Sequence, residues 1–337
     1  MPRRAAVALL LCLLALTLAV AARLLIDPAG LAWPADPAIL ALRADRAAAG
    51  LIVGAALAGA GVMLQSLFRN PLAAPELLGL ASGAGLTVSL AAYLGYRAGE
   101  GVAPAASPFA AALIGSLGTL ALVYALGQKR GLIEPVALIL GGAEDHPEDH
   151  ADQDQGHGVI LGAATALVRS LMPPDESQSI TIWLFGTLSD ELPRSRLWGA
   201  GIVTLLGVAL AAWLGRAMDA MAMSADEALS VGVRVGRVRA MLFIASGVLT
   251  AAAVSIAGPI GFVGFVCPHV ARLMMGPAHR PLAIGAAALG AALVIGADTL
   301  VRAIDLPSGR LPVGVVTALL GGPVLIAMLR GRGLGRF

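Results

Sequence analysis

The sequence predicts an all-α protein that crosses a membrane about ten times. Of its 337 residues, 58% are hydrophobic and only 13% are charged, whereas soluble domains carry about 25% charged residues. The apolar residues gather in runs of membrane-spanning length, separated by charged or proline- and glycine-rich breaks. The net charge of +2 is too small to indicate nucleic acid as a partner. We therefore expect one transmembrane domain over residues 1–337, in contact with membrane lipid.

Ten apolar runs are the candidates for membrane-spanning helices. The first follows Arg3 and Arg4 and could pass for a signal peptide, but we expect it to be retained because the rest of the chain is also membrane-embedded. Basic residues are more frequent at one set of helix ends, which predicts that both termini are cytoplasmic. The expected spans cover residues 5–25, 47–67, 77–96, 107–127, 135–172 (interrupted), 197–215, 239–257, 260–275, 281–300 and 313–329.

Residues 258–272 are apolar but are interrupted by two prolines and three glycines. Proline removes a backbone donor and glycine loosens the backbone, so one continuous helix is not expected. In a bilayer such breaks persist only where protein or water satisfies the freed backbone groups. The pattern therefore predicts a broken helix packed inside the bundle, as transporters use at moving parts. Its marker residues are Gly258, Pro259, Gly261, Gly264, Pro268, His269 and Arg272.

Several motifs occur in an order that resembles the FecCD (BtuC-like) family, the permease subunits of bacterial iron–siderophore, haem and cobalamin ABC importers. Besides residues 258–272, the similar segments are residues 61–79, 183–188, 297–302 and 311–318. Within residues 61–79, Asn70 and Pro71 are expected to end one helix in a tight elbow. The other marker residues of the resemblance are Asp298, Pro312 and Gly314. One departure is Asp45, which stands where the family usually has proline.

The resemblance implies a BtuC-like permease fold that works by alternating access in the bacterial cytoplasmic membrane. It implies three kinds of partner: a second permease subunit in a homo- or heterodimer, two cytoplasmic ATPase subunits and an extracytoplasmic binding protein. The chain has no P-loop of its own, because Lys129 is its only lysine and lacks the required glycine-rich context. We therefore expect a transport subunit that is not an enzyme and binds no cofactor, with ATP and Mg²⁺ on the partner. The expected cargo is a ferric siderophore, with haem and cobalamin as alternatives.

The loop of residues 216–239 contains a capping-box pattern, in which Ser224 and Glu227 open a short helix that Gly232 can close. An ordinary amphipathic loop helix at the membrane surface would carry the same pattern. The position also matches the coupling helix of the family, which sits in a groove of the ATPase. The resemblance therefore implies that the ATPase contacts Ser224, Ala225, Asp226, Glu227, Leu229 and Gly232.

Three arginines, Arg43, Arg46 and Arg302, match the positions at which the family docks its binding protein. Arginine suits this role because its planar fork can hold a carboxylate with two hydrogen bonds. Arg302 could instead pair with Asp298, four residues earlier on the same helical face. Both roles can coexist, because an aspartate within a membrane needs a partner.

An acidic, histidine-bearing insertion at residues 143–158 interrupts the fifth expected span. Carboxylates at this density are costly in hydrocarbon, so the segment must reach water or line a hydrated cavity. It is either a solvated loop or a Zn²⁺ site whose ligands include His146, His150 and His157. The metal reading suggests an alternative function, an ABC permease for Zn²⁺ or Mn²⁺. A different class, an ion-driven secondary transporter, would use Asp298 as a proton relay, but no second acidic residue in the core spans could receive the proton.

Overall fold

The computed structural model confirms an all-α membrane protein and describes residues 3–27, 30–98, 108–126, 128–129, 132–133, 156–189, 192–304 and 311–332. Within these residues, six helices are long and apolar enough to cross a membrane: α1 (Arg3–Leu25), α2 (Pro37–Leu67), α4 (Pro108–Leu126), α8 (Arg194–Met223), α10 (Val235–Ala257) and α12 (His279–Ala303). The remaining four expected spans contain α3 (Leu80–Arg97), α6 (Gly156–Ser170), α11 (Val263–Met275) and α13 (Val313–Arg332).

The connections contain short elements. The 3-10 helix η1 (Pro75–Leu78) joins α2 to α3, and α9 (Ala225–Ser230) joins α8 to α10. The helix α7 (Pro174–Leu184) follows α6. Two small antiparallel hairpins, β1 (Ile26–Asp27) with β2 (Gly30–Leu31) and β3 (Gln128–Lys129) with β4 (Leu132–Ile133), lie at helix ends.

The second helix, α2, is the centre of the bundle and packs against α12, α10, α8 and α11. Its half after Ala47 is almost entirely buried because glycine and alanine dominate it. Small residues let helix backbones approach where no hydrophobic force drives helices together in lipid. At the crossing with α12, a Cβ on Gly54 would lie 2.1 Å from the carbonyl oxygen of Gly290. The two backbones therefore touch directly.

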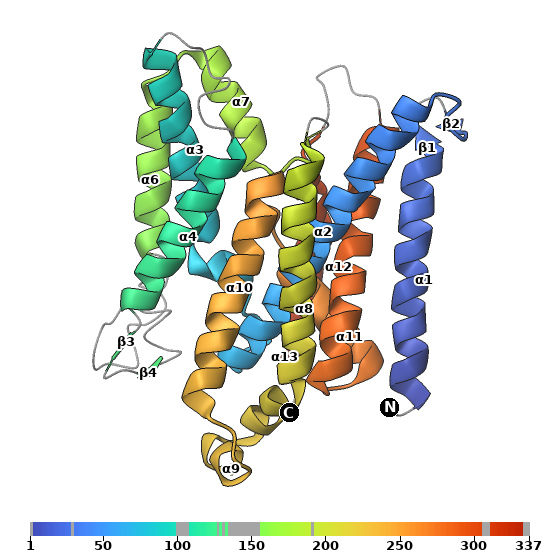
Figure 1. Ribbon diagram of the computed structural model, residues 1–337, viewed down its shortest axis with the longest axis vertical. Coiled ribbons are helices and arrows are strands. Elements are labelled where there is room, and N and C mark those ends of the chain that lie inside the picture. The colour runs from blue at the N-terminus through green and yellow to red at the C-terminus, as the bar shows by residue number, and fades with distance from the viewer. Residues whose placement is uncertain are drawn as a thin grey trace.

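The helices stand side by side, with α1 at one edge of the bundle and α3, α4 and α6 grouped at the opposite edge (Figure 1). Both chain ends and α9 lie at the same end of the molecule, at the bottom of Figure 1. The β1–β2 hairpin and α7 lie at the other end. We call these the α9 end and the α7 end.

The expected break after α10 is confirmed. The helix α10 ends at Ala257 and α11 starts at Val263. At about 1.5 Å per residue, the 13 residues of α11 span about 20 Å, less than the about 30 Å of a bilayer core. The helix α11 therefore cannot cross a membrane alone and must be packed inside the bundle.

The predicted insertion at residues 143–158 lies outside the described residues, except for the backbone of its last residues at the start of α6. The predicted metal ligands His146 and His150 and the side chain of His157 are therefore not described. The metal and solvated-loop readings of this segment both stay predictions.

Candidate functional site

Three segments that the sequence singled out meet at the break between α10 and α11. The amide of Thr187 donates to the carbonyl of Ala257 (2.7 Å), and the amide of Gly314 donates to the carbonyl of Gly186 (3.2 Å). A Cβ on Gly186 would lie 2.2 Å from the carbonyl oxygen of Pro259. We call this contact of residues 183–188, 257–262 and 311–314 the glycine junction. At Gly186 and Gly314 the segments touch through their backbones, so these two positions have no room for a side chain.

Glycine is required at residue 258 for two independent reasons. Its φ of 67° lies in the left-handed region, which residues with a Cβ seldom adopt. In addition, a Cβ at this position would lie 2.3 Å from the carbonyl oxygen of Trp183. The amide of Gly258 donates to Val254 (2.8 Å) and so closes the last turn of α10. The chain therefore turns sharply against the end of α7.

The residue before α11, Phe262, has a φ of 68°. A positive φ is an outlier for a bulky residue, and such strained residues cluster at functional sites. The Phe262 side chain packs against α13 where that helix has no side chain, since a Cβ on Gly321 would lie 2.4 Å from the Cβ of Phe262. Two residues later, a Cβ on Gly264 would lie 2.4 Å from the Cδ of Pro75. The break is thus held between α13 and the elbow before α3.

The elbow after α2 has the tight turn that the sequence predicts. The side-chain oxygen of Asn70 accepts the amide of Leu72 (3.0 Å), and its carbonyl accepts the amide of Ala73 (3.0 Å). Pro71 lies between Asn70 and Leu72, and Pro75 is the first residue of η1. The polar turn and the following proline direct the chain back into the bundle toward α11.

A buried charge cluster joins α1, α2 and α12 near the α7 end. The carboxylate of Asp298 is 1% exposed and accepts hydrogen bonds from Arg23 Nε (2.9 Å) and Arg46 Nη2 (2.7 Å). Arg43 donates from Nη1 to the carbonyl of Leu24 (2.8 Å). Arg23, Arg43 and Arg46 are all buried, with at most 8% exposure. Two of the three arginines expected to dock a binding protein therefore make contacts within the chain.

We expected a partner for Asp298 but considered only Arg302, which lies one turn away on α12 and is partly buried. Arg23 was missed. Its only signal in the sequence is a charge at the end of the first apolar run. A carboxylate buried in a membrane protein needs compensating positive charge, and every arginine at the same end of the spans was a candidate.

At the opposite end, the short helix expected in the loop of residues 216–239 is present as α9. Ser224 Oγ accepts the amide of Glu227 (3.0 Å), and Gly232 takes a φ of 82° just after the helix. Ala228 is fully buried, whereas Leu229 is 58% exposed. The side chains of Ala225 and Asp226 lie outside the described part of the structure. The helix α9 is capped, anchored and exposes an apolar side chain.

The remaining signature residues lie on α11 and at the start of α13. Pro268 lies inside α11 and His269 follows it. Arg272 Nη2 donates to Gln65 Oε1 on α2 (3.4 Å), and Pro312 precedes α13 at the glycine junction. Most of the signature residues therefore lie on α11 or next to it, whereas Asp298 lies in the charge cluster on α12.

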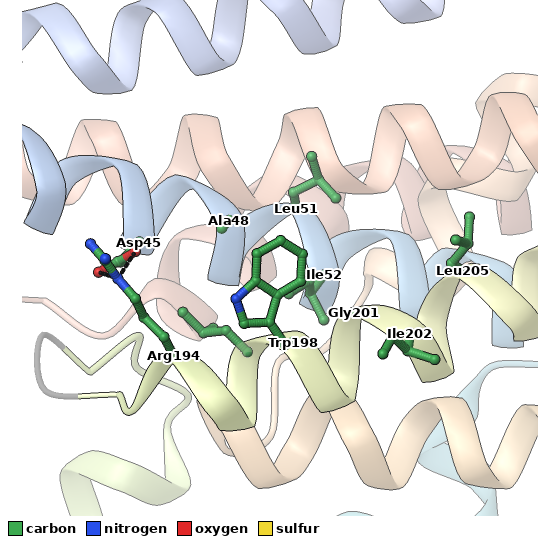
Figure 2. A pocket seen from close by; sticks show the side chains of 10 residues that line it. Asp45, Ala48, Leu51, Ile52, Arg194, Trp198, Gly201, Ile202 and Leu205 are labelled. Atoms are coloured by element: carbon green, nitrogen blue, oxygen red, sulfur yellow. Dashed lines mark hydrogen bonds and ion pairs between the residues drawn. The ribbon is translucent and has the colours of Figure 1, made fainter.

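An apolar groove of about 510 Å³ lies between α2 and α8, and Figure 2 shows the side chains that line it. Asp45 and Arg194 close one end of it with an ion pair (3.1 Å). Trp198, Ile202 and Leu205 line the α8 side. The departure from the family pattern at Asp45 therefore adds an exposed link between α2 and α8.

Among the described residues, no three histidine, cysteine or acidic side chains are grouped to hold a metal ion. The fold and the glycine junction together define a multi-pass membrane permease built around a broken helix. The chain belongs to the FecCD transport family, whose model matches residues 5–331.

Individual relatives agree with this assignment. The chain is 36% identical to the cobalamin import system permease protein BtuC of Halobacterium salinarum over 287 residues, which cover 85% of this chain and 72% of the relative. It is 35% identical to the ferric enterobactin transport system permease protein FepD of Escherichia coli, over 86% of this chain and 81% of the relative. A chain of a metal-chelate type ABC transporter in an inward-facing conformation matches with a TM-score of 0.79 and 26% identity, over 97% of this chain and 99% of that one.

Proposed function

We propose that this chain is the membrane-spanning permease subunit of an ABC importer that moves an iron chelate across the bacterial cytoplasmic membrane. The glycine junction is the observation that carries the proposal. An alternating-access permease needs an element that can change its position inside a packed bundle. The short α11, with the strained Phe262 before it and glycine contacts around it, has these properties.

The cargo is best described as a ferric siderophore, with haem and cobalamin as alternatives. Membership of the FecCD transport family supports a chelate cargo. The names of the relatives include both a ferric siderophore and cobalamin. The predicted metal ligands His146, His150 and His157 have no described side chains, so the alternative of a Zn²⁺ or Mn²⁺ permease stays a prediction.

Energy comes from two ATPase subunits that bind ATP and Mg²⁺, and we propose that each contacts one copy of α9. The end of this helix presents exposed apolar side chains on Leu229 (58%) and Val231 (69%). Apolar side chains grouped on a protruding element are typical of interaction sites. The Ser224 cap stabilises the first turn of α9. Because α9 directly connects α8 and α10, a displacement of α9 by the ATPase would also displace the ends of these two helices. If the ATPase binds α9, the α9 end, with both termini, faces the cytoplasm.

The opposite α7 end then faces the extracytoplasmic binding protein, and a second permease subunit completes the pathway. The docking role of Arg43, Arg46 and Arg302 stays a prediction. Because Arg43 and Arg46 are buried and hydrogen-bonded, a charge reversal at either residue would also disturb the fold. A docking measurement on such variants therefore needs a stability control.

Uptake by reconstituted proteoliposomes tests the proposed function. The permease, its ATPase and its binding protein are assembled. Uptake of ⁵⁵Fe-labelled ferric siderophores, of ⁵⁵Fe-labelled haem and of cobalamin labelled with radioactive cobalt is then measured with and without ATP. We expect uptake of one of these chelates only with ATP and the ATPase. Uptake driven by an ion gradient without the ATPase would establish a secondary transporter instead. Uptake of free Zn²⁺ or Mn²⁺, with none of any chelate, would establish a divalent-metal permease.

A further inference from the structure

A small cavity is lined by residues near the ends of α2, α8, α11 and α12. These helix ends lie at the α9 end of the molecule (Figure 1). The volume of the cavity is about 270 Å³, below the about 300–1,000 Å³ typical of pockets for drug-sized ligands. It is therefore suited to a small ion and not to an iron chelate. Its lining consists of Gln65, Ser66, Arg69, Pro71, Ala222, Arg272 and His279.

The cavity is lined by positive charge. Arg69 and Arg272 contribute two guanidinium groups, and none of the lining residues is acidic. The neighbouring carboxylate of Asp219 is already engaged, because its Oδ1 accepts both the amide (2.9 Å) and Nδ1 (2.7 Å) of His279. Asp219 also interacts electrostatically with Arg272, but one carboxylate offsets only one of the two guanidinium charges. An anion entering the cavity would therefore meet net positive charge.

The cavity walls also contain hydrogen-bond donors that lack acceptors. Within the part of the chain that the structure describes, neither Gln65 Nε2 nor Arg272 Nε has a hydrogen-bond partner, although both atoms are buried. Gln65 is 4% exposed, and its Oε1 already accepts a hydrogen bond from Arg272. Leaving buried donors unpaired is costly, so an occupant that brings acceptors would be stabilised.

We propose that this cavity binds an oxyanion of the phosphate type. Phosphate oxygens are acceptors only, and guanidinium groups bind them with short charge-assisted hydrogen bonds. Arg272 and Gln65 supply the buried donors, and the exposed Arg69 adds a second guanidinium group to the lining. Because the ligand would bridge α2 and α11, its binding holds these two helices together at the α9 end. The proposal does not depend on the cargo of the permease.

The test is a titration of the full-length chain, purified in an uncharged maltoside detergent, with inorganic phosphate. Chloride at equal ionic strength is the reference, and calorimetry and the midpoint of thermal unfolding are measured. We expect saturable binding of phosphate and a raised midpoint in the parent. Arg272→Gln should weaken binding at least about tenfold, because one charge-assisted hydrogen-bond donor is lost.

Two further variants separate binding from folding. Arg69→Gln changes an exposed residue and should also weaken phosphate binding, which keeps the test valid if Arg272→Gln does not fold. Arg280→Gln is the matched control, because Arg280 is exposed on α12 and does not line the cavity; it should bind phosphate like the parent. The absence of saturable binding in the parent would overturn the proposal. Equal affinity in the parent, Arg272→Gln and Arg69→Gln would overturn it as well.

Adding phosphatidylglycerol to the same samples distinguishes two sources of the phosphate group. If a lipid headgroup occupies the cavity, the lipid should reduce the affinity for free phosphate in the parent. It should then raise the unfolding midpoint of the parent more than that of Arg272→Gln. If the affinity for free phosphate is unchanged, the ligand is soluble phosphate. Either result upholds a phosphate site and identifies its occupant.

Discussion

Replacing Asp298 with alanine should destabilise the protein by about 3–5 kcal/mol, the usual cost of removing one partner of a buried ion pair. The carboxylate is 1% exposed and accepts from two buried arginines, Arg23 (2.9 Å) and Arg46 (2.7 Å). Its removal leaves both guanidinium groups in a dry environment without this acceptor. Asp298→Asn keeps one acceptor oxygen and loses the charge, so it should cost about 1.5–3 kcal/mol, the range for a hydrogen bond to a charged group.

The same chain offers a matched control in Asp45→Ala. Asp45 also pairs with an arginine, Arg194, at 3.1 Å, but the two side chains are 34% and 64% exposed. An exposed pair contributes only about 0–1 kcal/mol. Reversible unfolding in mixed micelles, followed by circular dichroism as dodecyl sulfate is added, measures both variants. A loss below about 1 kcal/mol for Asp298→Ala, or a loss equal to that of Asp45→Ala, would refute the assignment of Asp298 as a buried anchor.

Three further outcomes are expected. Leu229→Glu should leave the permease folded but uncouple ATP hydrolysis from uptake in proteoliposomes; full transport would exclude α9 as the ATPase contact. Gly258→Ala should cost at least about 1–3 kcal/mol of unfolding free energy because of strain at a positive φ, whereas Gly199→Ala, with no atom near the added Cβ, should be neutral or stabilising; equal effects would contradict the glycine junction. Deletion of residues 144–157 should leave a folded permease by size-exclusion chromatography and should abolish any Zn²⁺ binding seen by calorimetry; loss of folding would show that the segment is structural.

The positions of the spans could be predicted because long apolar runs have few alternatives to a transmembrane helix. The start of α2 could not. The sequence placed it at residue 47, because Arg43, Asp45 and Arg46 interrupt the apolar run, yet the helix begins at Pro37. These charges are tolerated within a helix because partners from α1, α8 and α12 compensate them. The partners lie far away in the sequence, so a local hydropathy pattern does not reveal them.

The glycine junction shows a similar limit. The motifs around Gly186, Pro259 and Gly314 were each singled out from the sequence, and the break after α10 followed from its glycines and prolines. Their meeting at one point was not predicted, because backbone contacts between distant segments leave no periodic pattern. The cap of α9 was predictable in detail, since Ser224 and Glu227 are neighbours in sequence and their hydrogen bond is local.

The charge cluster can form only late in biosynthesis, because its residues are far apart in the sequence. Arg23 precedes Asp298 by 275 residues, so at about 5–20 residues per second the ribosome needs about 14–55 s to supply the carboxylate. During this interval α1 is already made, and Arg23, in its last turn, can keep its charge at the water interface by snorkelling. Only when α12 is inserted can the guanidinium group move into its buried position. A chain that stops before α12 therefore lacks both the ion pair and the helix against which α1 packs most extensively.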